Sequence, residues 1–202
     1  MRNVLYTQRV EVIEDYGERR DCADQKIPSL IQACGYLPIP IPNILSVTQE
    51  MVLHLNPIGI ILSGGNSLEK YGGNAPERDA MERELLRIAL EKEIPVYGFC
   101  RGMQVIEDYF GAKLEAVKNH VAIKHKIEGS IGGHMVNSYH NQACYQVPDC
   151  LEVLAVSEDK VIEAIRVKGK WILGTMWHPE REKVFCKEDI ERIQHLFRKE
   201  VI

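Results

Sequence analysis

The sequence predicts an α/β protein: a three-layer sandwich around a mostly parallel sheet, with an antiparallel extension of that sheet. Two observations predict this class. Before Gly111, short apolar runs alternate with helical segments, which is typical of parallel strands joined by helices. After Gly111, β-type runs follow one another with turn residues between them, which is typical of antiparallel pairing. The 202-residue chain can bury a large core, so we expect residues 1–202 to form a single domain.

The N-terminal quarter begins with a predicted strand. Asn3 to Tyr6 is a short apolar run, and the charged stretch Thr7 to Gly17 is expected to be a loop. Arg20 to Cys34 carries apolar residues at helical spacing, and Pro28 marks either the start of a helix or a kink in it. Tyr36 to Ile41 is apolar but contains two prolines, which cannot donate to a β-ladder. We therefore predict a strand at an edge of the sheet.

The alternation of helices and strands continues to Phe110. Pro76 suits the first turn of the longest predicted helix, and the β-branched run that ends at Leu62 predicts a buried strand. The expected elements here are a short helix or turn over Thr48 to Leu55, a strand over Ile58 to Leu62, a loop over Ser63 to Asn74, a helix over Pro76 to Glu93, a strand over Ile94 to Phe99 and a helix over Gly102 to Phe110.

The C-terminal half contains short β-type runs and then one amphipathic helix. Turn signals such as Pro148-Asp149 and Lys168-Gly169 separate the runs. The expected elements are strands over Val136 to Tyr139, Leu151 to Ser157, Val161 to Val167 and Trp171 to Trp177, followed by a helix over Lys187 to Val201.

Composition excludes several classes of partner. The net charge of −4 gives no electrostatic reason to expect nucleic acid or an anionic membrane as a partner, and no apolar run is long enough to span a bilayer. The six cysteines form no CxxC pair, and no leader-like segment is apparent, so we expect reduced thiols in a cytoplasm. The seven histidines form no metal-binding motif, so we expect neither a metal ion nor a cofactor.

The stretch around Cys100 carries the strongest chemical signal. A buried strand, Ile94 to Phe99, turns abruptly into a helix at Cys100, with Gly98 and Gly102 two residues to either side. This is the spacing of a nucleophile elbow, in which a side chain at either glycine would clash. The sulfur would lie at a helix N-terminus, where partial positive charge favours the thiolate. The alternative is a buried structural cysteine in a strand-to-helix connection.

A cysteine nucleophile needs a base and a group that orients the base. His178 and Glu180 are two residues apart at the end of a predicted strand, so their side chains would point to the same side. Taken alone, they could equally be a surface histidine and a helix-capping glutamate. Together with Cys100 they favour a Cys-His-Glu triad. His140 is a competing base, but no acid follows it at short range.

An oxyanion hole is most simply built from backbone amides. The amide of Arg101 opens a helix next to Cys100, and Gly64 with Gly65 ends the preceding strand of the sheet. Because the carboxyl ends of parallel strands meet at one edge, these amides are expected to converge there. An ordinary turn is the alternative interpretation of Ser63-Gly-Gly65.

These motifs resemble those of the class I glutamine amidotransferases, and within them the γ-glutamyl hydrolase branch. Gly98 to Gln104 is similar to the nucleophile motif of that branch, and Gly174 to Glu180 is similar to its His-Pro-Glu motif. Val136 to Gln142 resembles the Asn-Ser-x-His stretch of γ-glutamyl-γ-aminobutyrate hydrolases, and Ser63 to Gly65 resembles the oxyanion loop. The resemblance covers nearly the whole chain and implies a flavodoxin-like sandwich.

The resemblance implies a free-standing hydrolase that cleaves a γ-glutamyl amide bond and releases L-glutamate from a small-molecule substrate. Cys100 would be the nucleophile, His178 the acid and base, and Glu180 its orienting partner. Gly65 and Arg101 would form the oxyanion hole. The implied contacts to the glutamyl group come from Gly64, from Gln104 and from the backbone of Ser138, Tyr139 and His140.

A narrower resemblance concerns the leaving group. The short segment between Gly111 and Asn137, and the opening Tyr6-Thr-Gln-Arg9, look more like the γ-glutamyl-CDP-amidate hydrolases of capsule phosphoramidate synthesis. That substrate carries a diphosphate, so a cation is expected near the first strand. Arg9 is the main candidate, with Arg19 and Arg20 as further ones. A solvated charged face is the alternative for these arginines.

Three other functions stay open at this level. The chain could hydrolyse γ-glutamyl-γ-aminobutyrate or another γ-glutamyl amine. It could be a glutaminase subunit that feeds ammonia to a synthase partner, although the sequence contains no synthase domain. It could also be a binding module without catalysis, against which the intact Cys100, His178 and Glu180 argue. The edge strand leaves a homodimer open.

Overall fold

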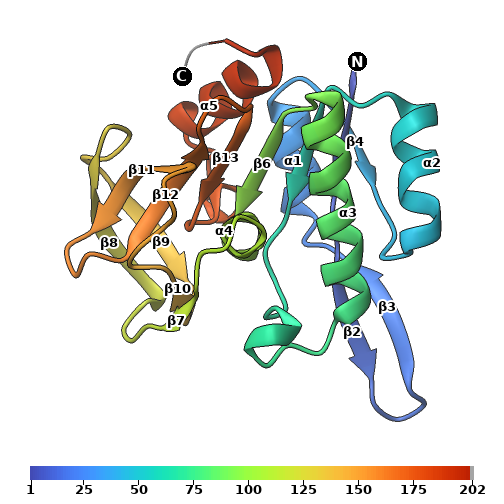
Figure 1. Cartoon of the computed structure of the whole chain (residues 1–202), viewed down its shortest axis with the longest axis horizontal. Coiled ribbons are helices and arrows are strands. Elements are labelled where there is room, and N and C mark those ends of the chain that lie inside the picture. The colour runs from blue at the N-terminus through green and yellow to red at the C-terminus, as the bar shows by residue number, and fades with distance from the viewer. Residues whose placement is uncertain (201–202) are drawn as a thin grey trace.

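The computed structural model describes residues 1–200. A nine-stranded sheet runs through the molecule in the order β4-β1-β5-β6-β13-β12-β11-β8-β9 (Figure 1). Neighbouring strands in its first part are parallel. These strands are β4 (Leu37–Pro40), β1 (Asn3–Tyr6), β5 (Gly59–Leu62), β6 (Val96–Phe99) and β13 (Ile172–Thr175).

The rest of the sheet is antiparallel. Its strands are β12 (Ile162–Val167), β11 (Leu151–Ser157), β8 (Val121–Gly129) and β9 (Met135–Tyr139). The predicted class, a mostly parallel α/β sheet with an antiparallel extension, is therefore confirmed. Two short strands outside the sheet, β7 (Glu115–Ala116) and β10 (Gln142–Ala143), pair with each other.

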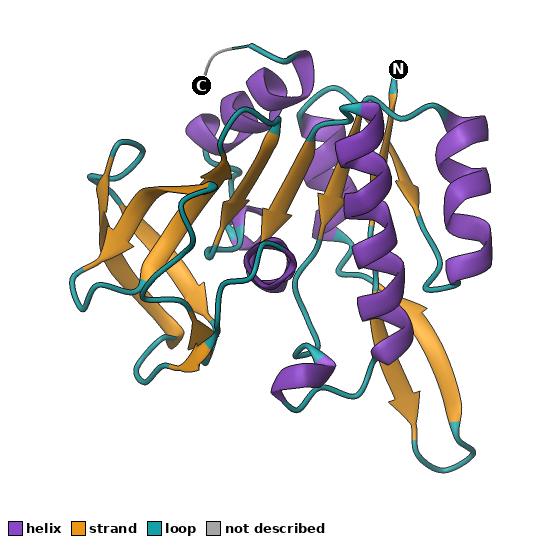
Figure 2. Ribbon diagram, viewed as in Figure 1, coloured by secondary structure: helices purple, strands orange, loops and turns teal. Residues whose placement is uncertain are grey.

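Helices cover both faces of the parallel strands (Figure 2). Alternate strand residues point to opposite faces, so Leu5 and Ile60 join one core cluster and Val4 and Ile61 the other. The first cluster lies under α2 (Leu45–Leu55), α3 (Pro76–Lys92) and α4 (Arg101–Tyr109), and the second lies under α1 (Lys26–Ala33) and α5 (Lys187–Arg198).

The segment after the first strand differs from the prediction of a loop. Strands β2 (Arg9–Ile13) and β3 (Glu18–Cys22) form an antiparallel hairpin, seen at the bottom right of Figure 1. Most of the hairpin is exposed. Strand β3 is polar, and the only buried residue of the pair is Val10, which alternates with charged residues in β2. The helix expected from Arg20 begins only at Lys26, because Arg20 to Cys22 belong to β3.

Other elements also differ from the prediction. Strand β8 was not predicted; most of its residues are exposed, and Ile127 is its one buried residue. Helix α2 begins at Leu45 rather than Thr48, and the loop over 63–74 contains the short 3₁₀ helix η1 (Glu69–Tyr71). The last helix ends at Arg198. Its expected end at Val201 lies outside the described residues.

The predicted edge strand is confirmed as β4, which pairs only with β1 in the described sheet. The amides of Leu37 and Ile41 donate to the carbonyls of Arg2 and Tyr6. Pro38 and Pro40 occupy two of the positions between them. No helix within residues 1–200 has both the length and the apolarity that crossing a bilayer requires.

Candidate active site

Cys100 stands at the turn between β6 and α4. Its backbone has φ 51° and ψ −111°, a conformation that residues other than glycine rarely adopt. The surrounding chain fixes it on both sides. The Cys100 amide donates to the carbonyl of Thr175 at 2.8 Å, and the Cys100 carbonyl accepts from the amide of Gln104 at 3.1 Å. Such a conformation costs free energy, so its presence points to a role for the position of the sulfur.

The two glycines around Cys100 are required by close backbone packing. A Cβ atom on Gly98 would lie 2.6 Å from the carbonyl carbon and oxygen of Gly102. A Cβ atom on Gly102 would lie 2.0 Å from the carbonyl oxygen of Leu62, in the neighbouring strand β5. Neither side chain could be accommodated without moving backbone. The spacing of these glycines in the sequence is thus explained by the elbow itself.

His178 follows β13 and is 2% exposed. Its Nδ1 lies 2.7 Å from Oε1 of Glu180, which is also buried. The main chain of His178 is held by Asn137, whose Oδ1 accepts from the His178 amide and whose Nδ2 donates to the His178 carbonyl, both at 2.9 Å. With Nδ1 engaged by the carboxylate, Nε2 is the nitrogen that remains for Cys100.

The pKa of His178 is set by opposing effects. Burial alone would lower it, but the charges of Cys100 and Glu180 and hydrogen bonds to them outweigh burial and raise the pKa of His178 to about 9. The imidazole is therefore protonated near neutral pH. A positively charged imidazolium stabilises a neighbouring thiolate, which is the nucleophilic form of cysteine.

The proposed oxyanion donors lie beside this pair. Gly65 has φ +91°, and a Cβ atom on Gly64 would come within 2.8 Å of the His178 ring. Arg101 is the first residue of α4, so its amide has no acceptor within the helix. The side chain of Arg101 is buried elsewhere, in ion pairs with Asp79 and Glu82. Only its backbone is placed for a role in the site.

A cleft of about 370 Å³ opens next to Cys100 and His178. It brings together most of the residues that the sequence singles out. Its lining residues are Gly65, Asn66, Ser67, Cys100, Arg101, Gln104, Tyr139, His140, Asn141, Gln142, His178 and Arg181. A smaller cavity that His178 also lines is bordered by Arg9, Gly64, Gly65, Phe99, Glu180 and others.

Ser138 and Gln104, two of the residues expected to contact the glutamyl group, make other hydrogen bonds in the structure. The Ser138 hydroxyl is buried and donates to the carbonyl of His120 at 2.6 Å, and Ser138 does not line the cleft. The Gln104 side chain lines the cleft, but its Nε2 already donates to the carbonyl of Gln142 at 2.8 Å. Gln104 therefore fixes the opposite wall of the cleft in the form seen here.

The three arginines of the N-terminal segment lie outside the main cleft. Arg9 lines the smaller cavity and pairs with Glu11 at 2.7 Å. Arg19 donates to Glu77, and Arg20 pairs with Glu18 within the exposed hairpin. Arg20 is thus part of a solvated charged face.

Arg181 is a cleft residue that the sequence reasoning did not identify. Its guanidinium lies 4.2 Å from the centre of the Tyr139 ring, and its Nε is 3.8 Å from Oε1 of Glu180. It lines both cavities. The available signal was its position directly after the His-Pro-Glu segment, at the carboxyl end of a parallel strand.

Fold and site together define an α/β protein with a cysteine elbow and a histidine–glutamate pair at the carboxyl ends of its parallel strands. The family model of glutamine amidotransferase class-I matches residues 20–191 of the chain. The chain therefore belongs to the class I glutamine amidotransferases, and it is an enzyme that acts on an amide C–N bond.

Individual relatives agree with this family. The γ-glutamyl-CDP-amidate hydrolase of Campylobacter jejuni is 35% identical over 179 residues, which span 87% of this chain and 88% of that protein. A glutamine-hydrolyzing GMP synthase subunit of Methanococcus vannielii is 32% identical, over 77% of this chain and 82% of that protein.

A solved structure shows the same fold. A Thermoplasma acidophilum protein described as a GMP synthase subunit superposes with a TM-score of 0.74 and 20% identity, covering 98% of this chain and 96% of that one. At this identity the likeness concerns the fold alone.

Proposed function

We propose that the chain hydrolyses a γ-glutamyl amide bond with Cys100 as nucleophile, His178 as acid and base, and Glu180 as the group that orients His178. The observation that carries the proposal is the 2.7 Å contact between His178 and Glu180, both buried, beside a cysteine held in a nucleophile elbow. His178 and Cys100 also line one cleft.

The reaction follows from this arrangement. The Cys100 thiolate attacks the γ-carbonyl carbon, and the backbone amides of Gly65 and Arg101 receive the developing negative charge on the carbonyl oxygen. Protonated His178 gives its proton to the leaving nitrogen, so the C–N bond breaks and a γ-glutamyl thioester remains. Neutral His178 then takes a proton from water, and the hydroxide attacks the thioester. L-Glutamate leaves, and the thiolate and imidazolium are restored.

The proposed substrate is γ-glutamyl-CDP-amidate, with cytidine diphosphoramidate as the second product. The 35% identity to the Campylobacter hydrolase over most of both chains supports this choice. The site supports it too, because Arg181 places a partly exposed guanidinium on the rim of the cleft, where a diphosphate could be bound.

The test is a substrate panel. Purified protein is assayed for glutamate release from γ-glutamyl-CDP-amidate, γ-glutamyl-γ-aminobutyrate, γ-glutamyl dipeptides and glutamine, with Cys100→Ala as the control. We expect the CDP-amidate to give the highest kcat/KM, and the variant to give no release. A higher kcat/KM for another γ-glutamyl amine would replace the proposed leaving group and keep the chemistry.

The diphosphate contact has a test of its own. Arg181→Ala is expected to raise KM for the CDP-amidate about tenfold, the order expected for loss of a charged hydrogen bond, and to leave KM for glutamine unchanged. Arg9→Ala tests the contact predicted from the sequence in the same way. Arg20→Ala serves as the matched control, because it removes an arginine of the exposed hairpin that lines neither cavity. Equal effects on both substrates would refute a role in leaving-group binding.

A second candidate function is that of a glutaminase subunit working with a synthase partner. The relative from Methanococcus vannielii favours it, since that protein is named as a subunit of a glutamine-hydrolyzing synthase. Under this function the chain alone would hydrolyse the panel poorly, and glutamine hydrolysis would rise on addition of the partner. Turnover of the CDP-amidate by the chain alone, at a rate no partner increases, would exclude it.

A further inference from the structure

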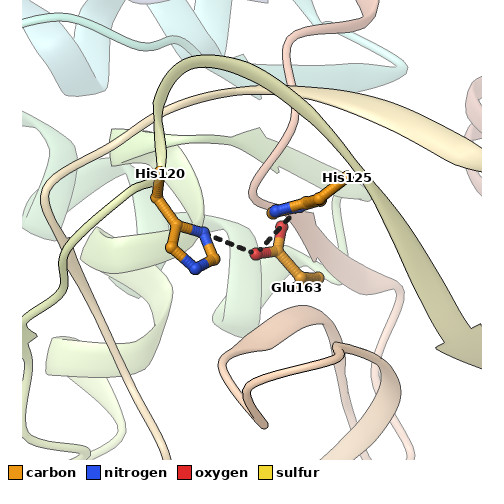
Figure 3. A group of neighbouring side chains, drawn as sticks. All are labelled: His120, His125 and Glu163. Atoms are coloured by element: carbon orange, nitrogen blue, oxygen red, sulfur yellow. Dashed lines mark ion pairs between the residues drawn. The ribbon is translucent and has the colours of Figure 1, made fainter.

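Three histidines and a glutamate meet behind one wall of the candidate active-site cleft. His120 lies just before β8, His125 lies within β8, His140 directly follows β9, and Glu163 lies in β12. Figure 3 shows the rings of His120 and His125 directed at the carboxylate of Glu163. The proposed catalytic chemistry uses neither of these two histidines, nor Glu163.

One carboxylate oxygen is the centre of this group. Oε1 of Glu163 lies 3.5 Å from Nδ1 of His120, 3.3 Å from Nε2 of His125 and 3.4 Å from Nε2 of His140. The ligand atoms of His120, His125 and Glu163 are all within 4.8 Å of one another. His140 contacts the same oxygen but is not a member of this group.

Hydrogen bonding does not account for these contacts. His120 and His140 are each 3% exposed, and Glu163 is fully buried. Within residues 1–200, however, neither oxygen of Glu163 has a hydrogen-bond partner, and the same is true of the three nitrogens that face it, His120 Nδ1, His125 Nε2 and His140 Nε2. A carboxylate that accepts from an imidazole does so at about 2.7–2.9 Å. Burying these polar atoms without partners costs free energy, unless a further group such as an ion binds them.

A metal ion accounts for both the distances and the missing partners. Zinc binds histidine nitrogen and carboxylate oxygen at about 2.0–2.2 Å in tetrahedral geometry. Two ligands of a tetrahedral ion at that distance are separated by about 3.4 Å. The separations of His120 Nδ1 and His125 Nε2 from Glu163 Oε1, 3.5 Å and 3.3 Å, are close to this value. Two neutral imidazoles and one carboxylate are also a donor set found in zinc sites.

A neighbouring carboxylate orients one of the ligands. Nε2 of His120 lies 3.0 Å from Oδ2 of Asp159, whose other oxygen accepts from the Ser157 hydroxyl at 2.6 Å. This contact places the ring proton on Nε2 and leaves Nδ1 as the lone-pair donor toward Glu163. Metal-binding histidines characteristically donate their second nitrogen to a carboxylate in this manner.

The backbone is irregular at the point that brings the ligands together. His120 and His125 are an odd number of residues apart, so a regular strand would place them on opposite faces. The register between β8 and β9 shifts between Val121 and Ile123, and Ala122 has φ 59°. This bulge inserts one extra residue and turns both histidines to the same side.

We propose that His120, His125 and Glu163 bind one divalent transition-metal ion, with zinc as the best match. These three protein ligands leave a fourth position on the ion. The site joins β8 and β12, and His140, which contacts the same oxygen of Glu163, lines the cleft with Asn141 and Gln142. The ion would hold that wall in place. The proposal does not depend on the substrate or on the catalytic roles given above.

The test measures metal on the whole chain. Metal is first removed with a chelator. The protein is then titrated with ZnCl₂ by calorimetry, and the bound zinc is quantified by elemental mass spectrometry. We expect about one tightly bound zinc ion per chain. Glu163→Gln and His125→Ala should lose it. His54→Ala, which removes an exposed histidine on α2, should keep it.

The catalytic pair could itself capture zinc, so Cys100→Ala is included and should retain the ion. Zinc bound by wild type and lost in Cys100→Ala but kept in Glu163→Gln would overturn the proposal, as would no zinc uptake by the wild-type protein. Cobalt replacement in the wild type decides the matter even where variants fail to fold. Strong visible absorption of four-coordinate Co²⁺ without a thiolate charge-transfer band supports the site, and a thiolate band refutes it.

Discussion

Two groups of histidine and carboxylate lie next to the end of β9, and they differ in spacing. In the first, His178 meets Glu180 at 2.7 Å, and His178 lines an open cleft together with Cys100. In the second, three imidazoles surround Glu163 at 3.3–3.5 Å. The same residue types therefore stand at hydrogen-bond distance in one place and at the separation of metal ligands in the other.

The two distances correspond to two kinds of chemistry. At 2.7 Å a carboxylate fixes the tautomer and charge of one imidazole, which suits proton transfer to and from the remaining nitrogen. At about 3.4 Å neither group satisfies the other, and a cation between them does. Four variants test this contrast.

Replacing the nucleophile should abolish the reaction and leave metal binding at the other group unchanged. Cys100→Ala is expected to lower kcat/KM for the preferred γ-glutamyl amide by about 10⁴-fold or more, because no other side chain of the cleft can form the thioester. Its zinc content should equal that of the wild type. Glutamate release and elemental analysis of one preparation measure both quantities. Residual turnover within about tenfold of wild type would remove Cys100 from the mechanism.

Glu180→Gln should change both rate and pH dependence. The amide no longer stabilises the imidazolium, so kcat/KM is expected to fall by about 10²–10⁴-fold. The wild-type rate should fall as pH rises through about 9, because His178 loses its proton there. Removing one of the charges that raise this pKa should move that limb to lower pH. Glu152→Gln, at an exposed pair, is the control; an unmoved limb would contradict the assignment.

Gly102→Ala tests the packing of the elbow. The added Cβ atom would lie 2.0 Å from a backbone oxygen of β5, so we expect a loss of about 3 kcal/mol in the free energy of unfolding. Gly72→Ala is the matched control, since its φ of +87° carries a penalty of about 1 kcal/mol while the space around it is open. Urea denaturation of both variants measures the difference. Equal losses would show that the elbow tolerates a side chain.

Asp159→Asn is expected to have the smallest effect. An amide holds the His120 ring less firmly, so zinc affinity should fall by about 10–100-fold while the stoichiometry stays the same. Glu158→Gln changes the adjacent exposed residue and serves as the control. Competition with a coloured chelator measures the affinity. If neither variant altered it, Asp159 would have no part in orienting a ligand.

The elbow could be predicted from the sequence, whereas the histidine group could not. The elbow was predictable because Gly98, Cys100 and Gly102 are close in sequence and their constraint is steric. The β2–β3 hairpin was not predicted, since β3 is exposed and polar and the alternation of Val10 and Val12 with charged residues in β2 is short. The histidine group was missed for another reason. Its members are dispersed from residue 120 to residue 163, and a bulge together with strand order, neither visible in the sequence, brings them together.

The prolines of β4 have a consequence for self-association. Along a parallel strand, successive amides point alternately toward and away from the neighbouring strand. Leu37 and Ile41 donate inward to β1, so Pro38 and Pro40 take the outward positions, where neither has an N–H group. That border of the sheet offers only acceptors, and an incoming strand from another molecule finds no donors to pair with. Any dimer that extended the sheet would therefore form along β9, at the opposite border.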